Sequence, residues 1–153
     1  MKFAPLLLAM LLSPVTALAD DTVQLAVRPQ AFENISNDDN ALNDLAFYAL
    51  SLSGTPYKFS GNSPDTGFDC SGFVGHVFNH SLGINLPRST DEIWQIGQEI
   101  SKDQLQPGDL VFYNTLKSAF SHVGIYLGDD RFVHSPSNGG SISVDNMREN
   151  YWQ

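Results

Sequence analysis

The chain has 153 residues and a mass of 16.8 kDa, which leaves room for one ordinary domain and not for several. With 42% hydrophobic, 11% aromatic and 16% charged residues, its composition is that of a globular protein able to bury a core. Seventeen acidic against eight basic residues give a net charge of -9, which repels phosphate backbones and anionic membrane surfaces. We therefore expect no binding to nucleic acid.

The N-terminal residues predict an export signal. A basic start is followed by an apolar run over residues 3–12, which is too short to span a bilayer. Ala17-Leu18-Ala19 gives an A-x-A cleavage site before Asp20. Residues 1–19 are therefore predicted to be a signal peptide, and they contain no cysteine that could accept a lipid. The mature chain is expected to be periplasmic or secreted, without a membrane anchor.

Residues 20–40 are polar and lack sustained periodicity, so they are predicted to form a flexible leader before a folded domain at 41–153. From residue 41 the apolar spacing is helical, and Gly54-Thr55-Pro56 ends that helix. A second helix is predicted over 70–81, with Asp69 as its N-cap. Its inward face carries Cys70, Phe73, Val74, Val77 and Phe78. A capping box formed by Ser89 and Glu92 predicts a short third helix that Gly97 ends.

The later residues alternate like strands, and the predicted strands are 110–113, 122–127, 131–134 and 141–144. Helices followed by strands indicate an α+β fold with an antiparallel sheet. If the second and third of these strands form a hairpin, His134 lies opposite Gly124. His122 is then the diagonal neighbour of His134 on the same face, and Gly124 has no side chain to crowd the space between them.

The only cysteine, Cys70, cannot form an internal disulfide. In an oxidising compartment an unpaired thiol is either buried and inert or kept for its reactivity. If its helix packs at the edge of the sheet, Cys70 can approach His122. The helix N-terminus would stabilise the thiolate, and His122 would accept its proton to form a thiolate–imidazolium pair. His134, kept neutral, would accept a hydrogen bond from the far ring nitrogen of His122 and orient it.

These segments resemble the NlpC-type cell-wall cysteine peptidases, which have a papain-like fold. The matching motifs are Asp69-Cys70-Ser71-Gly72, Ser121 to Tyr126, Phe132 to His134, Leu86 to Thr90 and Pro107 to Leu110, and the resemblance extends over residues 41–152. It implies N-terminal helices packed on a C-terminal antiparallel sheet. It also implies hydrolysis of amide bonds in peptidoglycan stem peptides, with Cys70 as nucleophile, His122 as base and His134 as the orienting residue.

The resemblance extends to residues around the nucleophile. Tyr57 matches a family tyrosine implied to help the Cys70 N–H hold the oxyanion. Asp69, Ser71 and Arg88 are candidates for substrate contacts, Arg88 because stem peptides carry carboxylates; a surface ion pair is the alternative for Arg88. Stem peptides are the expected partner of a monomer without a cofactor. Family precedent allows two cuts, at the D-glutamyl to diamino-acid bond or at the D-alanyl cross-link.

Two other functions remain open from the sequence. One is a non-catalytic cell-wall-binding module that retains the fold. The other is a zinc site formed by Cys70, His122 and His134, although the C-x-x-C or H-E-x-x-H spacing of dedicated sites is absent, and we expect no metal. His76 and His80 have a metal-capable spacing but are expected at a solvated helix edge. Four aromatic residues are expected in the core rather than in a saccharide groove, namely Trp94, Tyr113, Tyr126 and Trp152.

Overall fold

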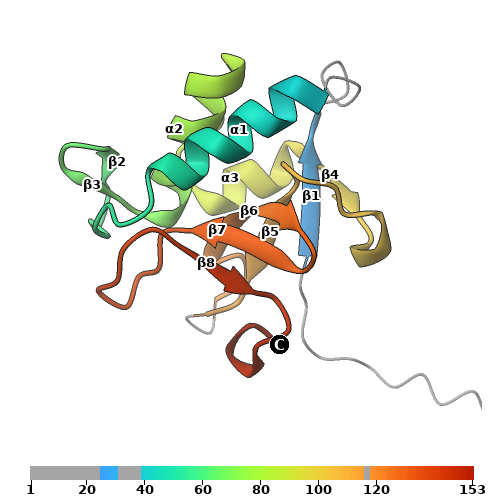
Figure 1. Ribbon diagram of the computed structural model, residues 1–153. Coiled ribbons are helices and arrows are strands. Elements are labelled where there is room, and N and C mark those ends of the chain that lie inside the picture. The colour runs from blue at the N-terminus through green and yellow to red at the C-terminus, as the bar shows by residue number, and fades with distance from the viewer. Residues whose placement is uncertain (1–24, 31–38, 116–117) are drawn as a thin grey trace, which may run out of the picture.

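The largest element of the computed structural model is a six-stranded antiparallel sheet with the strand order β4-β1-β5-β6-β7-β8 (Figure 1). The structure describes residues 25–30, 39–115 and 118–153, so the predicted signal peptide lies outside it. The strands of the sheet are β1 (Leu25–Pro29), β4 (Gly97–Ile100), β5 (Leu110–Tyr113), β6 (His122–Gly128), β7 (Arg131–His134) and β8 (Ser143–Asn146). A separate pair is formed by β2 (Asn62–Ser63) and β3 (Gly67–Phe68).

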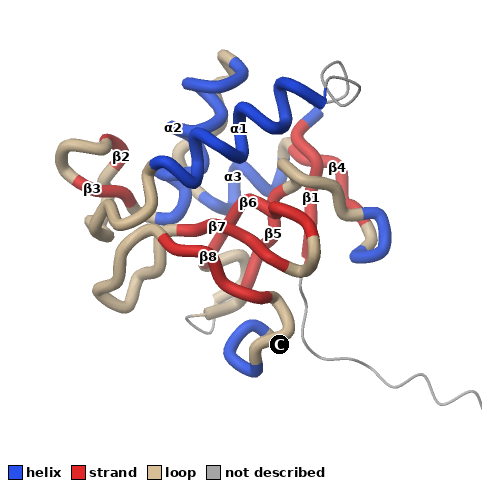
Figure 2. The backbone as a smooth tube through the Cα atoms, in the orientation of Figure 1, coloured by secondary structure: helices blue, strands red, loops and turns tan. Residues whose placement is uncertain are grey.

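Three α-helices cover one side of the sheet (Figure 2). They are α1 (Asp39–Ser51), α2 (Cys70–Leu82) and α3 (Thr90–Gln95), and two short 3-10 turns are η2 (Lys102–Gln104) and η3 (Asn150–Trp152). The C-terminal η3 lies on the side of the sheet away from α1. Among the residues that the structure describes, no helix combines the length and apolarity needed to cross a bilayer. The predicted α+β architecture, with helices packed on an antiparallel sheet, is confirmed.

Alternating residues of the strands build one hydrophobic layer on each side of the sheet, as the two-residue period of a strand requires. The helix-side layer includes Leu45, Ala49, Phe73, Val77, Phe112, Val123 and Ile125. The layer beneath η3 includes Ala26, Val111, Tyr113, Tyr126, Phe132, Met147 and Trp152. The inward face predicted for the second helix is confirmed, because its four apolar side chains are fully buried. Both faces of the central strands are thus covered.

The strand β1 corrects the prediction of a leader over residues 20–40. Leu25–Pro29 lies inside the sheet, paired with β4 on one side and β5 on the other. Arg28 donates to the buried carboxylate of Asp109 from Nε and Nη2, at 2.8 and 2.9 Å. The segment is too short for a clear alternation, and its strand conformation depends on partners about 70 to 85 residues away in the chain.

Two other strands also differ from the prediction. Gly97 opens β4 rather than only ending α3, and it packs so closely on Val27 that a Cβ at Gly97 would collide with that side chain. The last strand runs over Ser143–Asn146, two residues later than predicted. Ser141, the first residue of the predicted segment, instead forms an isolated antiparallel bridge with Pro56. The capping box of α3, with Ser89 and Glu92, is confirmed.

Candidate active site

The loop before α2 presents Cys70 as the first residue of the helix. Asp69 is the N-cap, and its Oδ1 accepts from the Gly72 N–H at 2.8 Å. The Asp69 N–H donates to the Gly61 carbonyl at 3.0 Å, which ties the cap to the preceding loop. A Cβ at Gly72 would collide with that same carbonyl, so the close approach requires glycine. Local sequence therefore fixes where the thiol enters the site.

Several groups act on the thiol of Cys70, and the largest effect is burial, which raises its pKa. The N–H groups of Val123, Ser71 and Cys70 itself oppose that rise, while the charge of Asp69 adds to it. Val123 follows His122 directly in β6, so this contact shows that the start of α2 lies against the start of β6. The helix N-terminus favours the thiolate, as predicted, but burial outweighs it.

Arg88 forms an ion pair with the N-cap. Its Nη2 lies 2.6 Å from Oδ2 of Asp69, and its Nη1 donates to Oδ1 at 3.0 Å. Nη1 also donates to the Ser71 hydroxyl at 2.8 Å. The ion pair considered as the alternative for Arg88 is therefore present, and its partner is the N-cap of α2. The pair offsets the negative charge that Asp69 would otherwise bring to Cys70.

The two strand histidines form a hydrogen-bonded pair. Gly124 pairs with His134 in the register of β6 and β7, as predicted, and a bulge at the far end of the hairpin leaves this register unchanged. The facing atoms, His122 Nε2 and His134 Nδ1, are 2.8 Å apart. A Cβ at Gly124 would collide with Phe132 and press on His134, so this position also requires glycine. The bond occupies Nε2 of His122 and leaves Nδ1 for another partner.

Both histidines are buried, and burial lowers their pKa values. The pKa of His122 falls to about 3, first through burial and then through the neighbouring His134. For His134, burial lowers the pKa and Asp145 partly restores it. Together with the raised pKa of Cys70, these shifts favour a neutral thiol and a neutral imidazole at rest. Both directions oppose the thiolate–imidazolium pair expected from the sequence.

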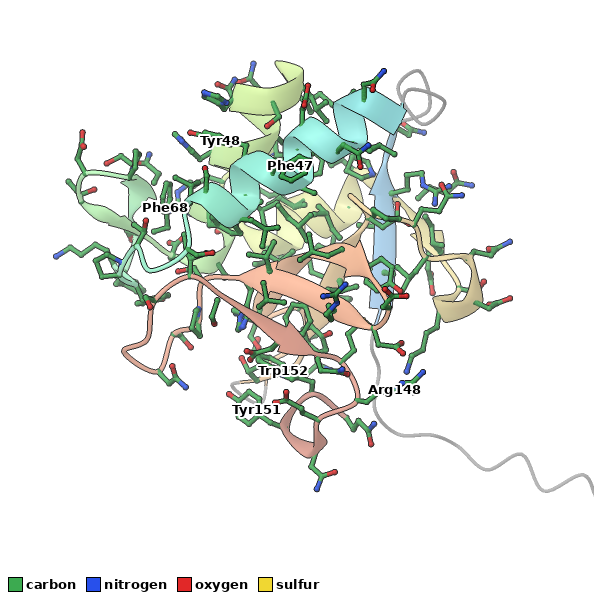
Figure 3. All side chains as sticks on the ribbon, viewed as in Figure 1. Phe47, Tyr48, Phe68, Arg148, Tyr151 and Trp152 are labelled. Carbon is green, nitrogen blue, oxygen red and sulfur yellow. The ribbon has the colours of Figure 1, made fainter. Side chains whose placement is uncertain are left out.

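Asp145, which the sequence did not indicate, and Trp152, which the sequence placed in the core, complete this side of the site. Oδ2 of Asp145, in β8, lies 3.2 Å from Nε2 of His134 and accepts from the indole N–H of Trp152 at 3.1 Å. Trp152 stacks on the ring of His122, with centroids 5.6 Å apart, and meets His134 edge-on. Figure 3 shows Trp152 on the side of the sheet away from α1. A strand extended to residue 146 would have placed Asp145 on the face of His134.

A cleft joins the helix side and the sheet side. One cavity of about 400 Å³ is lined by Tyr57, Phe59, Ser60, Asp69, Cys70, Ser71, Arg88, Ser89, Thr90, Ser121, His122 and Ser137. It brings together six of the seven predicted site residues; His134 lies beneath, bonded to His122. Burial raises the pKa of Tyr57, and the charges of Cys70 and Asp69 raise it further. A second cavity of about 420 Å³ lies on the other side of His122 and includes Asp145, Glu149 and Trp152.

The facing nitrogens of His122 and His134 bond to each other at 2.8 Å, which leaves no space for a metal ion between them. No group of three or more metal-ligating side chains is arranged to hold an ion within the part of the chain that the structure describes. His76 and His80 contact Tyr48 of α1. Nε2 of His76 bonds to the Tyr48 hydroxyl at 2.8 Å, and the ring of His80 stacks on that of Tyr48 with centroids 3.7 Å apart. These two histidines help to pack α2 against α1.

The aromatic residues considered for a saccharide groove belong to the core. Tyr113, Tyr126 and Trp152 are buried in the layer beneath η3. Trp94 is partly buried on the helix side, where it stacks on Phe120 with centroids 4.5 Å apart. The core interpretation is therefore confirmed, although Trp152 also borders the second cavity.

A cysteine at a helix N-terminus that shares a cleft with a histidine of an antiparallel sheet is the arrangement of a papain-like fold. The model of the NlpC/P60 family matches residues 54–153, and the chain belongs to this family. The gamma-DL-glutamyl hydrolase of Bacillus subtilis is 43% identical over 101 residues, which cover 65% of this chain and 24% of that protein. The murein DD-endopeptidase MepS/murein LD-carboxypeptidase of Escherichia coli is 35% identical over 137 residues, covering 90% of this chain and 71% of that protein.

Solved structures agree with this assignment. An NLP/P60 family protein of Staphylococcus aureus superposes with a TM-score of 0.66 and 38% identity, over 76% of this chain and 39% of that one. RipD of Mycobacterium tuberculosis, described as a non-catalytic domain adapted to peptidoglycan binding, gives a TM-score of 0.63 and 25% identity, over 73% of this chain and 92% of that one. The chain spans about a quarter of the length of the B. subtilis relative.

Proposed function

We propose that this chain is a peptidoglycan hydrolase, a cysteine endopeptidase that cuts amide bonds in stem peptides. The observation that carries the proposal is the cleft in which Cys70 and His122 line one cavity, with Nδ1 of His122 left available by the bond from Nε2 to His134. The relatives named as a glutamyl hydrolase and a murein endopeptidase support the substrate class. Cys70, His122 and His134 are the residues to which we assign catalysis.

The reaction begins from the neutral pair. As Sγ of Cys70 bonds to the scissile carbonyl carbon, its proton passes to Nδ1 of His122. The Cys70 N–H and the Tyr57 hydroxyl are assigned to the oxyanion of the tetrahedral intermediate. When the C–N bond breaks, the imidazolium of His122 gives its proton to the leaving amine. His122 then takes a proton from water, which attacks the thioester and releases the acid and the free thiol.

The helix side of the cleft is assigned to substrate binding. Asp69, Ser71 and Arg88 line the cavity beside Cys70 while they bond to one another. Arg88 remains about half exposed, so its outer edge can meet a stem-peptide carboxylate without losing Asp69. Monomeric action needs no further subunit, since both reacting groups come from one chain.

Export is part of the proposal. A hydrolase of the cell wall must act outside the cytoplasm, which agrees with a signal peptide at residues 1–19. The catalytic domain is then residues 41–153 together with β1, since the Leu25–Pro29 strand belongs to the same sheet. Removal of the signal would leave this strand in place, because cleavage is predicted before Asp20.

Digestion of purified muropeptides followed by mass analysis tests the function. We expect new fragments, and their masses distinguish a cut between D-glutamate and the diamino acid from a cut at the D-alanyl cross-link. Binding of muropeptides without any fragment would instead indicate a non-catalytic wall-binding module, as the description of RipD suggests for that relative. Activity should survive a metal chelator and be lost to a thiol alkylating agent, whereas a zinc site predicts the reverse dependence on the chelator.

A further inference from the structure

We propose that Asp145 is a positioning residue that fixes the proton arrangement of the histidine pair. This inference rests on the proposed function, because it assigns a role within the same site. The carboxylate does not touch the reacting atoms; it acts on His122 through His134. The chain of groups is therefore Cys70, His122, His134 and Asp145.

The geometry of the sheet places Asp145 by the same rule that places His122. In the β6–β7 pairing, His122 is the diagonal neighbour of His134, which lies opposite Gly124. In the β7–β8 pairing, His134 lies opposite Ser143, so Asp145 is its diagonal neighbour on the other side. Two successive diagonal steps thus carry a line of polar side chains across three strands.

The contacts along this line imply one order of donors and acceptors. For Nδ1 of His122 to accept the proton of the thiol, its neutral ring must carry hydrogen on Nε2. That N–H then donates to Nδ1 of His134 across the 2.8 Å contact. A neutral His134 that accepts at Nδ1 must carry its own hydrogen on Nε2, which lies 3.2 Å from Oδ2 of Asp145.

The carboxylate of Asp145 is placed to accept a hydrogen bond from Nε2 of His134. His134 is fully buried, and its Nε2 makes no well-aligned hydrogen bond. A carboxylate accepts and never donates when ionised, so Asp145 favours hydrogen on Nε2 and disfavours the other tautomer. The Asp145 side chain is 32% exposed and lines the second cavity, so it remains in contact with solvent.

Trp152 holds the carboxylate in place. Its indole N–H donates to the same Oδ2 at 3.1 Å, and its ring covers the face of His122. Asp145 is therefore restrained from one side by a fixed donor and faces His134 on the other. This is the arrangement in which a carboxylate orients an imidazole without taking its proton.

The test measures the tautomer directly. Because the chain has four histidines, ¹⁵N-labelled protein gives few ring signals to assign. In the wild type at neutral pH we expect His134 to be protonated on Nε2 and not on Nδ1. In Asp145→Ala we expect both tautomers of His134 to be populated, and kcat on muropeptides to fall about 100-fold with KM little changed. Asp103→Ala, which removes the same atoms from the exposed η2 turn, should match the wild type.

The outcomes separate this inference from the proposed function. Hydrogen on Nδ1 of His134 in the wild type would overturn it without any variant, so the test does not depend on whether Asp145→Ala folds. A folded Asp145→Ala with unchanged kcat would also overturn it. The same is true if that variant only unfolds at a lower temperature, with its tautomers unchanged, since this indicates a structural role. If the wild type cuts no muropeptide, the proposed function fails while the tautomer measurement still decides the role of Asp145.

Discussion

On the helix side of the cleft, Arg88 and Asp69 form an ion pair whose side chains are 47% and 15% exposed, whereas on the sheet side His122 and His134 are 2% and 0% exposed. The Arg88–Asp69 pair is charged and in contact with solvent, whereas the His122–His134 pair is neutral and buried. Water screens the charges of the ion pair, so its strength and its effect on Cys70 are modest. The buried pair has no such screening, and the loss of one partner leaves the other unsatisfied. Substitutions on the sheet side should therefore have the larger effects.

The largest effect on turnover is expected at Cys70, the residue on which both sides of the cleft act. Cys70→Ala removes the sulfur that would form the acyl-enzyme, and no other cysteine in the chain can replace it. We expect turnover of muropeptides to fall below detection, while the thermal unfolding midpoint stays close to that of the wild type. Cys70→Ser is the matched variant: it keeps a side chain of similar size but lacks the sulfur, so turnover should be lost there too. Near-normal turnover by the alanine variant would contradict the nucleophile assignment.

On the sheet side, His122→Gln should lower kcat by about 100-fold to 10,000-fold, the contribution of a positioned acid–base group. Glutamine keeps a polar side chain of similar reach but cannot take up the proton of the thiol. The measurement is steady-state turnover of a purified muropeptide. His80→Gln is the control, because His80 stacks on Tyr48 at the surface of α1 and α2. Equal losses in the two variants would count against a specific role for His122.

The buried pair of His122 and His134 also makes the free energy of unfolding depend on acid pH. Burial lowers the pKa of His122 from 6.5 to about 3, and that of His134 is lowered as well. The unfolded chain therefore binds protons below pH 6.5 that the folded chain does not bind. The free energy of unfolding should be greatest above this pH and should fall as pH drops toward 3, by up to about 1.4 kcal/mol per pH unit for each group.

Urea unfolding at a series of pH values measures this dependence. In His122→Gln one of the two groups is absent, so its free energy of unfolding should fall less steeply with acid than that of the wild type. Parallel curves for the two proteins would show that His122 does not contribute.

Local patterns predicted the elements that present the reacting groups. The N-cap at Asp69 follows from one residue type before a helical run, and the diagonal of His122 and His134 follows from counting across a short hairpin. Both depend on neighbours in sequence, where propensity and period are informative. Gly124 reinforced the second prediction, because a glycine between two facing histidines leaves space for their rings.

What the sequence did not predict depends on pairing between distant segments. β1 gains its strand conformation from β4 and β5, and no local signal marks Leu25–Pro29. Asp145 was missed because the last strand was predicted to end at residue 144, one residue before it, and because its pairing with β7 was not predicted. Similarly, the resting charge state of Cys70 depends on how deeply the folded chain buries it, which composition and spacing do not report.

The smallest effect is expected on the helix side. Arg88→Gln leaves the charge of Asp69 uncompensated near Cys70 and removes a cation that attracts the thiolate, so both changes raise the pKa of the thiol. Alkylation of Cys70 by neutral iodoacetamide at pH 7 should become slower, and the free energy of unfolding should fall by less than about 1 kcal/mol. Asp69→Asn keeps an N-cap and removes the opposing charge, so alkylation should become faster.

Arg131→Gln is the matched control for Arg88→Gln. It also breaks an exposed ion pair, with Asp129 at 3.5 Å, but this pair lies in the hairpin turn at the opposite end of β6 from His122. Its alkylation rate should equal that of the wild type. If Arg88→Gln also leaves the rate unchanged, the ion pair on the helix side does not act on Cys70. If alkylation of Cys70 instead becomes slower in Arg88→Gln and faster in Asp69→Asn, the charges of this exposed pair act on the thiol. The helix side of the cleft then sets the charge around Cys70, while its proton acceptor, His122, belongs to the buried sheet side.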